Sequence, residues 1–153
     1  MGNDVIYIGS DHAGYRLKLK IKRLLERTGH KAVDVGVNDD RKRYDYPKTA
    51  AKVAKKVADE GGRGILLCGT GLGEAIAANK FKGVRAANCF NEYTARMSRE
   101  HNDSNVLCLG ARVLGGKEAE KITKAWVEAD FSKEERHIRR LKQIKDIEKK
   151  ACR

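Results

Sequence analysis

Short apolar runs alternate with longer segments in which apolar residues recur every three or four positions, throughout the 153-residue chain. The short runs are typical of buried parallel strands, and the spaced apolar residues are typical of amphipathic helices. We expect strands at residues 5–8, 31–35, 64–68, 84–89 and 106–109. Strands that alternate with helices form βαβ units. The pattern predicts an α/β fold: one doubly wound domain over residues 1–153 with a five-stranded parallel sheet.

The helices are expected between these strands. The first carries an apolar stripe and stops at Thr28-Gly29, and the second opens at Tyr46-Pro47, where proline is tolerated. Further helices are expected at 74–79, at 92–100 and around Ala119, Ile122 and Trp126. Ser132 and Glu135 have the spacing of a capping box for a C-terminal helix. Its apolar side, expected to pack on a partner or a neighbouring element, consists of Ile138, Leu141, Ile144 and Ile147.

The charge of the chain is strongly positive. The formal net charge is +12, and residues 136–153 carry eight basic residues against Asp146 and Glu148. A solvated helix face explains such a pattern, as does attraction of an anionic substrate or of nucleic acid. The sequence leaves these three interpretations open.

Composition excludes several classes of protein. The four cysteines, at 68, 89, 108 and 152, form no C-x-x-C pair and have no histidines at zinc-finger spacing. Neither a metal site nor a disulfide framework is therefore expected. The chain shows no secretory leader and no apolar run of membrane-spanning length. These observations predict a soluble, cytoplasmic protein.

The glycine-rich loop Gly69-Thr70-Gly71-Leu72-Gly73 follows the apolar run that ends at Cys68. Its backbone N–H groups could approach an oxyanion or a phosphate. The dinucleotide fingerprint needs a glycine where Glu74 stands, and a cysteine phosphatase needs an arginine there. Cys68 is either a reactive thiol with a lowered pKa or a buried cysteine at a strand end.

Two histidines and two arginines are further candidates. His12 and His101 lie in polar loops, and we expect both on the same side of the sheet, where they would suit proton transfer or substrate binding. Arg136 and Arg140 are four residues apart and share one helix face. Two planar guanidinium groups on one face are suited to clamping a phosphate.

Six short motifs occur in order between Gly9 and Arg140. They are G-S-D-H-A-G at 9–14, D-Y-P at 45–47, C-G-T-G-L-G at 68–73, I-A-A-N-K at 76–80, R-E-H-N-D at 99–103 and R-H-I-R-R at 136–140. Together they resemble the type B ribose-5-phosphate isomerases. The resemblance implies a Rossmann-like, three-layer domain with a C-terminal helix. It also implies a homodimer, sometimes paired into tetramers, whose active sites use residues of both subunits and need no metal or other cofactor.

The same resemblance implies a reaction and a set of roles. The reaction interconverts D-ribose 5-phosphate and D-ribulose 5-phosphate through an enediolate, in the non-oxidative pentose phosphate pathway. Asp11 and Tyr46 would hold sugar hydroxyls, and His101 would open the furanose ring. The groups that would stabilise the enediolate are Asn102 and the amides of Gly69, Gly71 and Gly73. The groups that would bind phosphate, some across the dimer, are His12, Arg112, Arg136 and Arg140.

The chemistry needs a base that moves a proton between C2 and C1, and Thr70 could relay protons between the two oxygens. One branch of the family uses the cysteine at position 68 and another uses a glutamate at position 74, whereas this chain has both. A helix N-terminus favours a charged thiolate and opposes a raised pKa for Glu74. We therefore expect Cys68 as the base, with Glu74 as the alternative. Ala75 stands where members of the family often have serine. One hydrogen bond to the substrate or within the loop is therefore missing, which affects the expected phosphate affinity but not the reaction type.

Two other functions remain open. A hexose-6-phosphate isomerase of the same family, acting on allose or galactose phosphate, differs in pocket length rather than in chemistry. The basic C-terminal segment also permits a nucleic-acid-binding module on an inactive isomerase fold, although no set of stacking aromatic residues accompanies it.

Overall fold

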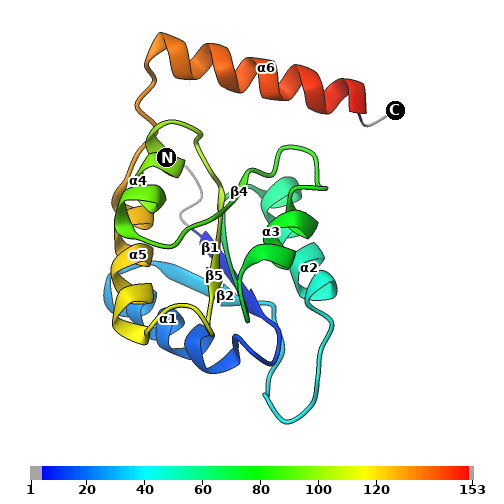
Figure 1. Cartoon of the computed structure of the whole chain (residues 1–153), viewed down its shortest axis with the longest axis vertical. Coiled ribbons are helices and arrows are strands. Elements are labelled where there is room, and N and C mark those ends of the chain that lie inside the picture. Colours follow the sequence, from blue (N-terminus) through cyan, green and yellow to red (C-terminus); the bar gives the residue numbers. More distant parts are fainter. Residues whose placement is uncertain (1–4, 152–153) are drawn as a thin grey trace.

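The computed structural model describes residues 5–151, and it contains one sheet of five parallel strands (Figure 1). The strands are β1 (Val5–Ser10), β2 (Lys31–Asp34), β3 (Arg63–Cys68), β4 (Ala86–Asn88) and β5 (Val106–Gly110). Their order across the sheet is β2-β1-β3-β5-β4, with every neighbouring pair parallel. The expected α/β class and five-stranded parallel sheet are confirmed.

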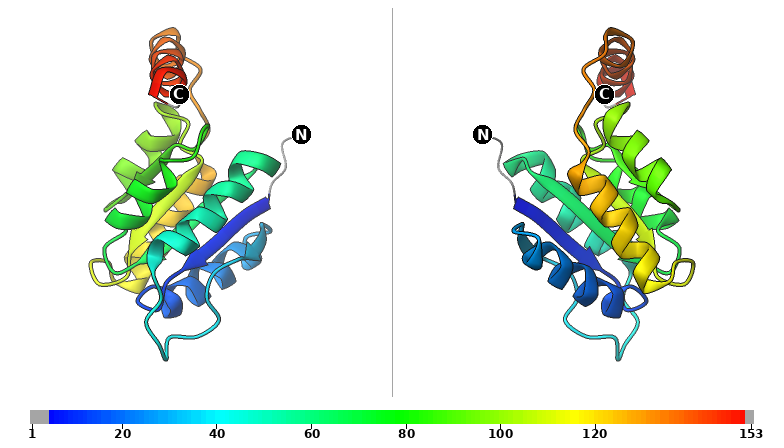
Figure 2. Two further views of the ribbon diagram at one scale, coloured as in Figure 1. Left: turned by 90° about the vertical axis from the view of Figure 1, so that its right-hand side faces the viewer. Right: turned by 90° about the vertical axis from the view of Figure 1, so that its left-hand side faces the viewer.

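Helices cover both faces of the sheet (Figure 2). They are α1 (Tyr15–Arg27), α2 (Tyr46–Glu60), α3 (Leu72–Ala78), α4 (Glu92–Glu100), α5 (Gly116–Glu128) and α6 (Glu135–Ala151). The helices α1, α4 and α5 pack on one face, and α2 and α3 pack on the other. The result is the three-layer arrangement expected of βαβ units.

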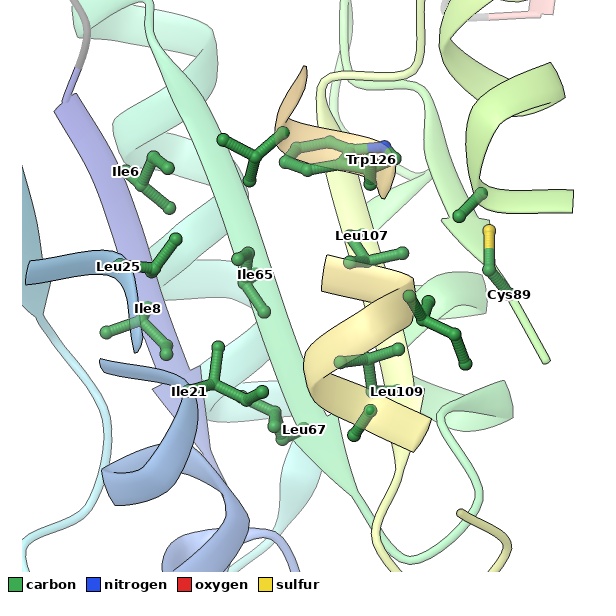
Figure 3. Packing of buried hydrophobic residues seen from close by; sticks show 14 of the residues in the cluster. Ile6, Ile8, Ile21, Leu25, Ile65, Leu67, Cys89, Leu107, Leu109 and Trp126 are labelled. Carbon is green, nitrogen blue, oxygen red and sulfur yellow. The ribbon is translucent and has the colours of Figure 1, made fainter. Parts of the chain in front are cut away.

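The central strands are buried on both faces because successive side chains of a strand point to opposite sides. In β3, Ile65 and Leu67 join the larger apolar cluster, shown in Figure 3, and Leu66 joins the cluster on the other face. Trp126 of α5 is fully buried in the larger cluster, and its indole N–H donates to Ser104 Oγ at 2.8 Å. These two clusters hold the strand ends in fixed positions.

Some expected boundaries are wrong. The strand expected at 84–89 is only Ala86–Asn88, because Val84 N donates to Phe81 O in a turn. The helix expected at 74–79 starts earlier, since Ala75 N already bonds to Gly71 O.

The expected capping box is also wrong. Helix α6 begins at Glu135, so Ser132 lies too far upstream to cap it, and Ser132 Oγ instead bonds to His137 Nδ1 at 2.7 Å. The end of the expected helix and Cys152 fall outside the described residues.

Helix α6 lies across one end of the domain (Figure 1). Much of its apolar side faces solvent: Ile138, Ile144 and Ile147 are 50%, 45% and 65% exposed. A hollow of about 620 Å³ separates Ile144 and Ile147 from the turn around Arg85. The helix is therefore unpaired along most of its apolar stripe within this one chain.

Lys18 is a fully buried cation on α1. Its Nζ lies 2.9 Å from Asp34 Oδ2 and also donates to the carbonyl of Val37. The lysine thus fixes the start of the loop that joins β2 to α2. Further along the same loop, Tyr44 N donates to His12 Nδ1 at 3.0 Å. Lys18 occupies a position on the apolar stripe of the first helix, which is the sequence signal for its burial.

We expect Lys18→Met to lower the free energy of unfolding by about 2 kcal/mol, because it leaves Asp34 unpaired beside a buried site. Asp34 is partly exposed, so the loss stays below that of a fully buried pair. Lys22→Met is the matched control, since Lys22 pairs with Glu26 on the exposed side of α1 and such pairs contribute little. Urea denaturation of both variants measures the difference, and equal losses would contradict it.

Candidate active site

Three neighbouring strands deliver the candidate residues to one edge of the sheet. In the register of the sheet Ser10 pairs with Leu67, and Cys68 pairs with Gly110. The loops that follow these strands therefore meet at their carboxyl ends, where open parallel sheets bind ligands. A cavity of about 200 Å³ opens there, and its walls are Asp11, His12, Ala13, Tyr46, Cys68, Gly69, Thr70, Gly73 and Arg112.

The first loop carries Asp11 and His12. Asp11 is buried, and its Oδ1 accepts hydrogen bonds from Ala13 N at 2.9 Å and Gly14 N at 3.1 Å, which fixes the turn into α1. His12 Nδ1 accepts from Tyr44 N, so a neutral ring carries its proton on Nε2. His12 can therefore offer one N–H donor to a ligand.

The 69–73 loop passes over the end of β3 and leads into α3. Gly71 N donates to Cys68 Sγ at 3.1 Å, and Leu72 N donates to Thr70 Oγ1 at 3.3 Å. Gly73 lies against Tyr46, since a Cβ atom added there would be 2.5 Å from Tyr46 Cζ. The tyrosine ring and the loop thus form adjacent walls of the cavity.

Arg112 supplies the positive charge of the cavity. Its backbone N donates to Gly69 O at 2.9 Å, and its guanidinium packs over Gly69, where an added Cβ would lie 3.3 Å from Nη1. It takes part in no ion pair with a carboxylate in the part of the chain that the structure describes. The group is free to bind an anion.

The protonation of Cys68 and Glu74 differs from the expectation. Burial raises the pKa of the Cys68 thiol and the Glu74 carboxyl raises it further, although the N–H groups of Thr70 and Gly71 act to lower it. Burial also raises the pKa of Glu74 well above its ordinary value, and Asp11 adds to this shift. The expected lowering of the Cys68 pKa is wrong, and the helix N-terminus does not keep the pKa of Glu74 low, because burial outweighs both effects.

The remaining candidates lie elsewhere. His101 and Asn102 directly follow α4, Arg136 and Arg140 belong to α6, and none of the four lines the cavity. His101 follows α4, which runs back from the carboxyl edge of the sheet, and its ring stacks against His137 with centroids 4.3 Å apart. The expectation that His12 and His101 share one side of the sheet is wrong, because a residue at the end of a crossover helix lies at the opposite edge.

Comparison with known proteins identifies the family. The sequence model of the family described as Ribose/Galactose Isomerase matches residues 6–144 of this chain. The chain belongs to this family.

Relatives cover nearly the whole chain. Ribose-5-phosphate isomerase B of Escherichia coli is 44% identical over 95% of this chain and 97% of the relative. The protein of the same name from Mycobacterium tuberculosis strain H37Rv is 41% identical over 94% of this chain and 90% of the relative. The family assignment therefore rests on the entire domain rather than on one motif.

Solved structures of family members have the same fold. Ribose-5-phosphate isomerase B of Clostridium thermocellum is 49% identical with a TM-score of 0.92, covering 96% of this chain and 99% of that one. The enzyme of Mycoplasma genitalium, solved with bound ribulose-5-phosphate, is 42% identical with a TM-score of 0.91, covering 95% and 96%.

The sequence analysis does not single out two residues that the structure brings to notice, His137 and Lys18. His137 is buried and touches His101, but only the fold brings α6 to the end of α4. Lys18 supports the loop that holds His12, and its place on an apolar stripe is the signal that could have found it.

The described residues were expected to hold neither a metal site nor a membrane-spanning helix. No group of three or more His, Cys, Asp or Glu side chains between residues 5 and 151 could hold a metal ion. No helix of that segment has the length and apolar character needed to cross a membrane. The expectation of a reaction without metal stays a prediction.

We expect Gly71→Ala to destabilise the fold more than Gly83→Ala. Both glycines have φ of 80°, which costs a residue with a Cβ about 1–2 kcal/mol. A Cβ at position 71 would also lie 2.6 Å from Asn88 Oδ1 and 3.1 Å from the backbone of Leu109, whereas position 83 is open. Chemical denaturation of the two variants isolates the cost of this contact, and equal losses would show that the loop can shift freely.

Proposed function

We propose that this protein interconverts D-ribose 5-phosphate and D-ribulose 5-phosphate through an enediolate, as a step of the non-oxidative pentose phosphate pathway in the cytoplasm. The observation that carries the proposal is its likeness, over 95% of the chain, to the Mycoplasma genitalium enzyme solved with bound ribulose-5-phosphate. The cavity at the carboxyl edge supports it, because a thiol, a glycine-rich loop and an arginine converge there.

The proposed chemistry uses the cavity as follows. Cys68 takes the proton from C2 and returns it to C1, because Cys68 lines the cavity while Glu74 does not. The amides of the 69–73 loop stabilise the oxyanion, and Thr70 relays a proton between the two oxygens. Asp11 and Tyr46 hold the sugar hydroxyls. His12 and Arg112 bind the phosphate.

We further propose that the active form is a homodimer whose two sites are shared. In one chain, the proposed ring-opening His101, the enediolate donor Asn102 and the phosphate ligands Arg136 and Arg140 lie away from the cavity. A second subunit that packs against the exposed apolar side of α6 could bring its own copies of these residues to the cavity. Burial of that side would supply the hydrophobic driving force for association.

The first test is to mix the purified protein with ribose 5-phosphate in EDTA and to follow the appearance of ribulose 5-phosphate. Rapid conversion is expected, because the proposed base and oxyanion donors all belong to the protein. Conversion only after metal is added would contradict the reaction without metal. Activity on allose or galactose 6-phosphate alone would move the function to six-carbon substrates, in keeping with the family's description.

Complementation tests the shared site. We expect Cys68→Ala and His101→Ala to be inactive separately, and their mixture to regain about one quarter of the wild-type activity after joint unfolding and refolding. Half of the dimers are then mixed, and each mixed dimer holds one intact site and one site with both changes. A mixture of two variants changed at the cavity, Cys68→Ala and Asp11→Ala, is the control and should stay inactive. Absence of recovery in the first mixture would contradict sharing.

A further inference from the structure

The turn that follows α4 carries His101 and Asn102 and is held by a network of polar contacts. Asn102 is exposed, and Asp103 has a φ of 44°, in the left-handed region that few residues with a Cβ adopt. Asp103 N donates to Arg99 O at 3.0 Å, which closes the turn at the end of the helix. A strained backbone of this kind keeps one shape only where the groups around it determine that shape.

Two arginines provide such groups, and the carboxylate of Asp103 bridges them. Arg85 Nη2 lies 3.0 Å from Asp103 Oδ2, and Arg99 Nη1 lies 2.8 Å from Asp103 Oδ1. Arg85 Nε also donates to the backbone carbonyls of Asn102, at 3.1 Å, and of Asp103, at 2.9 Å. These carbonyls follow the C-terminal end of α4, where a positive charge is favourable. One planar guanidinium therefore holds both the backbone and the carboxylate of the turn.

The two arginines differ in what else they contact. Arg99 belongs to α4, donates to the carbonyl of Ala129 at 3.3 Å and lies over the ring of the buried Trp126, so its loss would also disturb the core. Arg85 lies directly before β4. Among the residues that the structure describes, the side chain of Arg85 bonds only to the turn and, at 3.4 Å, to Gly83 O. Its side chain thus acts mainly on the turn.

We propose that Arg85 is a positioning residue of the isomerase, which fixes the turn so that His101 and Asn102 meet the sugar. The inference rests on the proposed function, in which His101 opens the furanose ring and Asn102 stabilises the enediolate. Ring opening moves a proton from the hydroxyl on C1 to the ring oxygen, while the bond between C1 and that oxygen breaks and the C1 carbonyl forms. Misplacement of a group by about 1 Å can slow such chemistry about a hundredfold.

Local hydrogen exchange tests whether Arg85 holds the turn. Mass spectrometry of a peptide that covers residues 99–105 reports the amides of Asp103 and Ser104, both of which are hydrogen-bonded to carbonyls of α4. We expect this peptide to exchange about tenfold faster in Arg85→Met than in wild type. Arg85→Lys keeps the charge without the planar fork and should be intermediate. The matched control is Arg27→Met, which removes an exposed arginine of α1 that forms only a long ion pair, of 3.7 Å.

Mixed dimers separate positioning from a general loss of structure. Alone, Arg85→Met should lower isomerase activity by between about tenfold and a hundredfold, whereas Arg27→Met should not. Refolded together with Cys68→Ala, Arg85→Met should regain about one quarter of wild-type activity, because each mixed dimer then holds one site with an intact cavity and an intact turn. The mixture with His101→Ala should stay low, since both variants are changed at the turn.

Three results would overturn the proposal: equal exchange in all four proteins, wild-type activity of Arg85→Met, or no recovery when it is mixed with Cys68→Ala. The last result would show damage to the whole subunit, provided that His101→Ala does complement Cys68→Ala. An inactive wild-type protein would instead contradict the proposed function, and failure of that reference mixture would contradict the shared site. The exchange measurement needs neither sugar nor a shared site, so it decides in both cases whether Arg85 holds the turn.

Discussion

The register of β1, β3 and β5 is the constraint on which the rest of the site depends. Backbone hydrogen bonds continue past the strand ends, from Asp11 N to Leu67 O, from Ala111 N to Cys68 O and from Arg112 N to Gly69 O. Each bond ties the first residues of one loop to the neighbouring strand or loop. The apolar clusters on both faces hold these strands, so the positions of the loops follow from core packing rather than from contacts among the polar residues themselves.

The same geometry explains why one chain holds only part of the proposed site. A right-handed crossover helix returns the chain to the amino edge of the sheet, and therefore it carries His101 away from the cavity that contains His12. Helix α6 lies on the same side as His101, since His137 of α6 stacks against the ring of His101. The arginines of α6 are therefore also remote from the cavity, and the isoleucines of α6 remain exposed. In a dimer with two-fold symmetry, the amino edge of each sheet can lie against the carboxyl edge of the partner's sheet, so the same contact is made twice. An exposed apolar helix and a divided set of polar residues are thus two consequences of one topology.

The sequence predicted the fold class and the sheet because the apolar periodicity of each element agrees with its final environment. It also predicted the residues at the carboxyl ends of β1 and β3, since these follow directly from the strands. Sequence patterns do not predict features that depend on how the elements pack together, such as the edge of the sheet at which a residue lies or the burial of a side chain. His101 follows a helix rather than a strand, so it lies at the edge of the sheet opposite the cavity, and a polar loop in the sequence does not show which edge it occupies. The local motif indicates a lowered pKa for Cys68, whereas burial, which a local motif does not show, raises it.

The presence of both Cys68 and Glu74 follows the same logic. A glutamate directly after a glycine-rich loop is expected to be exposed at a helix start, but Glu74 is fully buried in the first turn of α3 and does not line the cavity. A base must reach the substrate, and of these two residues Cys68 alone lines the cavity. The motif alone thus makes the two residues equal candidates, whereas the fold exposes only one of them to the cavity.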